Sequence, residues 1–121
     1  MNTPMQRMDA IRKEPTASEI VDLEQITRRI VARFHPRRIV LFGSRARGEA
    51  GPESDVDLFI EMESEERPPK RASAVAALFG LRRWAMDVVV YTPAEVQRLR
   101  GVRGTLLSMI EAEGRVLYEQ A

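Results

Sequence analysis

The stretch that decides the fold runs from Ile39 to Met62, where IVLFGS (39–44) and SDVDLFIEM (54–62) flank a short polar connection. The apolar run from Ile39 to Phe42 ends at Gly43, which predicts a short buried strand. From Asp55 to Met62 the side chains alternate, so that one face is apolar and the other carries two carboxylates. We therefore expect two strands joined by a turn that begins at Gly43-Ser44.

The elements around these strands follow from helical spacing, caps and breakers. Thr16 and Glu19 have capping-box spacing and predict a helix over 17–34, ended by His35-Pro36. Pro68-Pro69 predicts the start of a second helix, and a β-branched strand is expected over Met86–Tyr91. Thr92-Pro93 predicts a third helix that is interrupted at Gly101 and Gly104, resumes, and ends at Gly114. A last edge strand is expected over 115–119. This order predicts an α/β (α+β) fold, a small mixed sheet flanked by helices.

Composition sets limits on the class of protein. The 121 residues suit one domain, expected over 16–121, preceded by a polar, flexible arm over 1–15. There is no cysteine, which excludes disulfides and thiolate metal sites, and His35 is the only histidine. No apolar run approaches the roughly 20 residues of a membrane span, and no targeting signal is visible. A cytoplasmic protein is expected.

The overall charge argues against tight binding of nucleic acid. Nineteen basic and 18 acidic residues give a net charge of +1. A protein that holds nucleic acid by neutralising phosphates carries a larger basic excess. With 6% aromatic residues, a platform for stacking bases is also poorly supported. A nucleic-acid-binding regulator that uses the basic residues of the arm remains an alternative, and its binding would be weak and salt-dependent.

Asp55 and Asp57 are the first candidates for chemistry. Strand alternation places both carboxylates on one face, about 7 Å apart. Such a pair repels itself unless a cation lies between, and Mg²⁺ prefers hard oxygen ligands that it shares with substrate phosphates. Taken alone, the pair is slightly better explained as two solvated residues on an exposed face.

Gly43-Ser44 supplies a second feature. Backbone N–H groups at a turn after a strand can point at a phosphate, and a short helix is expected over Arg45–Arg47. This is not a Walker loop, because no Gly-Lys-Ser/Thr follows. Asp87, in the later strand, reaches the same face as Asp57 if the two strands are neighbours. Three carboxylates then suffice for two metals and an in-line displacement.

The combination is more specific than its parts. Gly43-Ser44-Arg45-Ala46-Arg47-Gly48, followed by Ser54-Asp55-Val56-Asp57-Leu58, resembles the signature of the polymerase-β-like nucleotidyltransferase superfamily. The run Leu41–Phe59 looks like its minimal nucleotidyltransferase branch, and Met86–Val90 is similar to the family's strand for the third carboxylate. The resemblance covers about Ile39 to Tyr91.

The resemblance implies a role for each residue. Gly43 and Ser44 would bind the triphosphate of ATP, and Asp55, Asp57 and Asp87 would be catalytic and hold Mg²⁺, with a two-metal site expected. Arg45 or Arg47 would neutralise the leaving pyrophosphate. Surface ion pairs to Glu49 or Glu53 explain these two arginines equally well.

The resemblance also implies a partner. Minimal nucleotidyltransferases are often antitoxins paired with a HEPN-domain RNase toxin, and they are understood to transfer AMP to a tyrosine of the toxin. A hetero-oligomer with such a toxin is therefore expected. Two alternatives stay open: a small-molecule hydroxyl acceptor, such as an aminoglycoside, and an antitoxin that acts by contact without catalysis.

Overall fold

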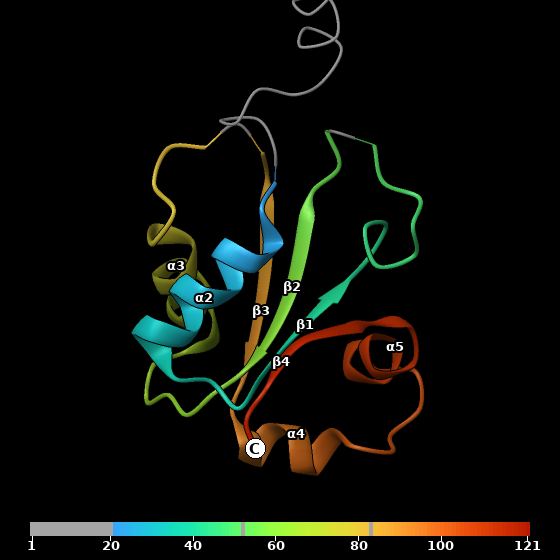
Figure 1. Ribbon diagram of the computed structural model, residues 1–121. Coiled ribbons are helices and arrows are strands. Elements are labelled where there is room, and N and C mark those ends of the chain that lie inside the picture. Colours follow the sequence, from blue (N-terminus) through green and yellow to red (C-terminus); the bar gives the residue numbers. More distant parts are fainter. Residues whose placement is uncertain (1–20, 52, 83) are drawn as a thin grey trace, which may run out of the picture.

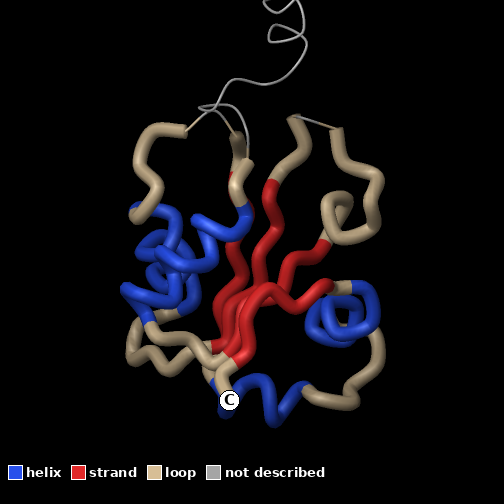
Figure 2. The backbone as a smooth tube through the Cα atoms, in the orientation of Figure 1, coloured by secondary structure: helices blue, strands red, loops and turns tan. Residues whose placement is uncertain are grey.

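The computed structural model describes residues 21–51, 53–82 and 84–121. In that part of the chain a four-stranded sheet of order β3-β2-β1-β4 lies between two pairs of helices (Figures 1 and 2). The mixed α/β architecture expected from the sequence is confirmed. No helix among these residues is long and apolar enough to cross a membrane.

The sheet combines antiparallel and parallel pairing. β1 (Arg38–Phe42) lies antiparallel to β2 (Val56–Glu61) on one side and to β4 (Arg115–Glu119) on the other. β2 and β3 (Met86–Tyr91) are parallel, and α3 (Pro68–Ala77) makes the crossover that parallel neighbours require. Because β1 runs antiparallel to β2, and β2 parallel to β3, the end of β1 lies at the same edge of the sheet as the starts of β2 and β3.

The first described helix, α2, spans Leu23–Phe34. Its N-cap is Asp22, whose carboxylate accepts a hydrogen bond of 3.0 Å from the Gln25 amide. The prediction that this helix runs back through residues 21 and 22 is wrong, because Asp22 already provides the cap. The expected cap at Thr16 lies outside the described residues. His35 caps the end of the helix in the left-handed conformation (φ 50°), and its backbone N–H donates to the Val31 carbonyl.

The remaining helices begin where the sequence predicts. α3 starts at Pro68, and α4 (Pro93–Leu99) carries a full capping box between Thr92 and Glu95. After the break at Gly101 and Gly104, α5 spans Leu106–Glu113 and ends at Gly114. A methyl group on Gly114 would lie 2.4 Å from Cγ1 of Val40, so the chain must have glycine where α5 turns into the sheet.

Two apolar cores follow from the alternation along β2. Val56, Leu58 and Ile60 face α2 and α3, together with Ile26, Ile30 and Val75. On the opposite face Phe59 packs with residues of β1, α4 and α5, namely Val40, Phe42, Val96, Leu107 and Ile110. Figure 2 shows these helix layers on the two sides of the sheet. Asp57 has the same parity as Phe59 and therefore lies on the face covered by α4 and α5.

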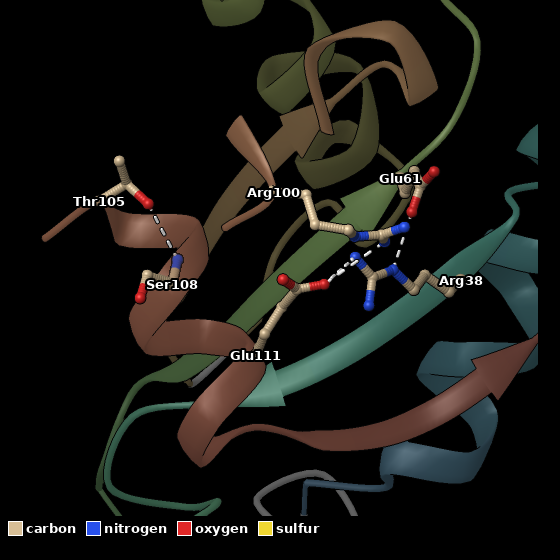
Figure 3. A network of polar contacts seen from close by, with 6 residues as sticks. All are labelled: Arg38, Glu61, Arg100, Thr105, Ser108 and Glu111. Carbon is tan, nitrogen blue, oxygen red and sulfur yellow. Dashed lines mark hydrogen bonds and ion pairs between the residues drawn. The ribbon is translucent and has the colours of Figure 1, made fainter. Parts of the chain in front are cut away.

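A network of charged side chains lies on that second face, at the end of the β1–β2 pair opposite Asp57 (Figure 3). Arg38 donates hydrogen bonds to Glu61 (2.8 Å) and to Glu111 of α5 (2.9 Å), and its guanidinium lies over the ring of Phe59. Only 9% of the Glu61 side chain is exposed, so the pair is nearly desolvated and each charge depends on the other. This network anchors α5 at the end of the sheet away from Asp57.

Candidate active site

The turn after β1 lies against the carboxylate of Asp57, which comes from the neighbouring strand β2. Gly43 has a φ of +76°, and a Cβ built on it would lie 2.2 Å from Oδ2 of Asp57. Only glycine adopts this backbone conformation without strain and also leaves room for the carboxylate. The turn is closed by hydrogen bonds from the amides of Ala46 and Arg47 to the Gly43 carbonyl, at 3.1 and 3.2 Å. It is a hydrogen-bonded turn and not the short helix expected over 45–47.

The three candidate aspartates gather beside this turn. Asp57 pairs in register with Phe42 on one side and with Asp87 on the other. Neighbouring strands are about 4.8 Å apart, so Asp57 and Asp87 are closer than two carboxylates along one strand. Asp55 precedes β2 by one residue. The condition set for Asp87, that its strand lies beside β2, is met.

The electrostatics of Asp57 reflect this crowding. Burial raises the pKa of its carboxyl above the ordinary value, and the negative charges of Asp87 and Asp55 raise it further. The positive charges of Arg47 and Arg45 act in the opposite direction. Without a cation, ionised Asp57 is therefore held at a cost in free energy.

The two arginines of the turn have different partners. Arg45 donates from Nε and Nη2 to the carbonyl oxygen of Ser54, at 3.2 and 2.8 Å. Arg47 pairs with Glu49 at 2.9 Å and, more loosely, with Glu113 of α5 at 3.7 Å. The ion pair between Arg47 and Glu49 is the surface ion pair that the sequence analysis offered as an alternative, and the side chain of Arg47 is 43% exposed. A role of either arginine toward pyrophosphate stays a prediction.

The oxygen atoms of the three aspartates are ligands that suit Mg²⁺, although the carboxylates do not converge on one position. In the described part of the chain no three acidic or histidine side chains are arranged to hold a metal ion by themselves. Mg²⁺ at phosphoryl-transfer sites takes one or two carboxylates and completes its shell with phosphates and water. Asp55 and Asp87 are exposed and Asp57 is half-buried, so the carboxylates fit an ion that arrives with a nucleotide.

Ser54 is a further residue of the site, for which the sequence analysis assigned no role. Its amide donates to the Gly51 carbonyl (3.1 Å), and its hydroxyl accepts from the Gly51 amide (3.0 Å). Together with the Arg45 bonds, these contacts fix the residue that precedes Asp55. Its position directly before the paired aspartates was the feature of the sequence that could have indicated a structural role. The contact of Arg47 with Glu113 had no such signal, because the two residues are far apart in the chain.

Comparison with known proteins agrees with this geometry. The sequence matches the family described as "Nucleotidyltransferase domain" over residues 23–118. A solved structure of a nucleotidyltransferase candidate from Sulfolobus solfataricus has the same fold, with a TM-score of 0.56 and 20% identity, covering 81% of this chain and 78% of that one. No curated protein matched the sequence. Since the family match spans β1, β2 and β3, the turn and all three aspartates, the chain belongs to the nucleotidyltransferase domain family.

Proposed function

We propose that this protein is a Mg²⁺-dependent nucleotidyltransferase that moves AMP from ATP to a tyrosine hydroxyl of a partner HEPN-domain toxin, and so acts as an antitoxin. The observation that carries the reaction type is the pairing of Asp57 with Asp87 on parallel neighbouring strands, against the backbone of Gly43. The acceptor and the partner rest on the resemblance of the motifs from Leu41 to Phe59 to minimal nucleotidyltransferases.

The reaction divides among residues of this one site. The hydroxyl oxygen of the acceptor attacks the α-phosphorus of ATP, and the bond from that phosphorus to the bridging oxygen of the β-phosphate breaks. Pyrophosphate leaves with the bonding electron pair, and the hydroxyl proton passes to a carboxylate oxygen of Asp87. Bound Mg²⁺ would supply charge neutralisation along the triphosphate. Asp55 and Asp57 would hold that ion, while Gly43 and Ser44 would position the phosphates.

The openness of the site favours a protein acceptor. Asp55 and Asp87 are both exposed, whereas the buried apolar residues of α4 and α5 pack against Val40, Phe42 and Phe59. A site of this kind leaves the acceptor to be presented from outside. A tyrosine on a folded partner is such an acceptor.

The test is intact mass spectrometry of a HEPN-domain protein encoded beside this one, incubated with this protein, ATP and Mg²⁺. We expect the partner to gain the mass of one or more AMP groups and the Asp55→Ala/Asp57→Ala variant to transfer none. The matched control is Glu63→Ala/Glu65→Ala, which removes two exposed carboxylates with the same spacing and should transfer normally.

Each outcome points to one function. Transfer that survives in the double aspartate variant would contradict the proposed site. An unmodified partner that is nevertheless silenced, also by the double variant, would favour inhibition by contact. If ATP binds but no partner is modified or silenced, a small hydroxylated acceptor becomes the better candidate.

A further inference from the structure

The connection between β1 and β2 consists of two separately closed turns. The first, over 43–49, is held by bonds to the Gly43 carbonyl and by the Glu49 amide on the Ser44 carbonyl (3.0 Å). The second joins Gly51 and Ser54 through two hydrogen bonds, one to the backbone carbonyl and one to the hydroxyl. The first turn carries the candidate phosphate-binding backbone, and the second leads directly into Asp55.

The side chain of Arg45 joins these two turns. Its Nε and Nη2 groups both donate to the Ser54 carbonyl, and the guanidinium is partly buried. A carbonyl that accepts two hydrogen bonds from one rigid, planar group is fixed in direction as well as distance. The peptide bond whose carbonyl is held links Ser54 to Asp55, so the contact acts on the backbone of a candidate metal ligand.

We propose that Arg45 is a positioning residue, which sets the place of Asp55 relative to the Gly43-Ser44 turn instead of contacting the triphosphate. The inference rests on the proposed nucleotide and metal site. Arg45 and Arg47 then have different tasks: Arg47 pairs with Glu49 and, more loosely, with Glu113 of α5, whereas Arg45 holds the Ser54 carbonyl of the loop. Loss of Arg45 therefore loosens the segment before β2.

Replacing Arg45 by lysine or by alanine distinguishes positioning by hydrogen bonds from neutralisation of phosphate charge. A lysine keeps the positive charge, but its single ammonium group does not reproduce two N–H donors held in one plane. Arg45→Lys should therefore behave like Arg45→Ala. An arginine that acted by neutralising phosphate charge would instead be replaced well by lysine. Arg28→Ala is the matched control, because Arg28 is an exposed residue on α2 whose ion pair with Glu24 lies outside the site.

The experiment measures amide hydrogen exchange in the metal-free full-length protein and Mn²⁺ binding by titration calorimetry, with and without a non-hydrolysable ATP analogue. In both Arg45 variants we expect peptides over 49–56 to exchange about tenfold faster and Mn²⁺ to bind about tenfold more weakly, with exchange in α2 and α5 unchanged. The tenfold figure corresponds to the loss of about one hydrogen bond.

Two results would overturn the proposal: exchange over 49–56 that equals that of Arg28→Ala, or Mn²⁺ and nucleotide binding fully restored by lysine. Should Arg45→Ala not fold, Arg45→Lys carries the same comparison. Failure of the wild-type protein to bind Mn²⁺ or nucleotide would refute the proposed function, and the exchange data would still decide whether Arg45 fixes the loop.

Discussion

Replacing Gly43 by alanine tests the closeness of the turn to Asp57. The new methyl group meets two obstacles. A non-glycine residue in the left-handed conformation costs about 1–2 kcal/mol. The Cβ would also lie 2.2 Å from Oδ2 of Asp57, whereas ordinary contact begins at 3.4 Å, so the carboxylate must move by about 1 Å. A displacement of that size at a reacting centre lowers the rate about 100-fold.

The control is Gly101→Ala. Gly101 also has a positive φ, +84°, but nothing lies within 4 Å of its Cβ position. In urea titrations Gly101→Ala should lose about 1–2 kcal/mol of unfolding free energy from backbone strain alone, and Gly43→Ala should lose at least as much, because it adds the contact with Asp57. In assays of pyrophosphate release with the acceptor, only Gly43→Ala should lose about 100-fold in kcat/KM. Wild-type activity in Gly43→Ala, or an equal loss in Gly101→Ala, would refute the reasoning.

Three further predictions concern stability. Asp57→Asn should abolish transfer yet raise the unfolding free energy at pH 7 by about 0.5–1 kcal/mol, a gain limited because water screens much of this carboxyl. Burial and like charges raise its pKa, so the gain should shrink as pH falls through the raised pKa and vanish well below pH 3.8, where the group is protonated in the folded and the unfolded protein. Glu95→Gln should destabilise by about 1.5–3 kcal/mol at pH 7, since the Thr92 amide and Arg71 lower the pKa of Glu95. This contribution is present above pH 4.5 and is lost as pH falls through the lowered pKa. In urea titrations the difference in unfolding free energy between the wild type and Glu95→Gln should therefore be smaller at pH 3 than at pH 7, and an equal difference at both would contradict the prediction. Gly114→Ala should cost about 1–3 kcal/mol through overpacking, and an unchanged melting temperature would show that the contact relaxes freely.

The periodicity of the sequence predicts the sheet and most helix starts, because caps and alternation are local signals. The capping box at Thr92 and the glycine break after α4 are examples. Local signals missed the start of α2 at Leu23, where Asp22 provides the observed cap. They failed again over Arg45–Arg47, where the hydrogen bonds form a single turn.

The candidate site divides in the same way. The spacing of Asp55 and Asp57 and the turn at Gly43 are visible in the sequence. The approach of Asp87 depends on which strands are neighbours, and this is fixed by the parallel register of β2 with β3. The attachment of Arg45 to a backbone carbonyl has no sequence pattern at all, since any residue offers a carbonyl. Partners of that kind are found only in three dimensions.

The central claim is that these aspartates and the Gly43-Ser44 turn form one metal–nucleotide site. The most direct measurement is the anomalous difference density of a crystal grown with Mn²⁺ and α,β-methylene-ATP. The account predicts a Mn²⁺ peak in contact with the carboxylates of Asp55 and Asp57 and with the triphosphate, which lies against the turn. Mn²⁺ and nucleotide bound away from these residues, or neither of them bound, would contradict it.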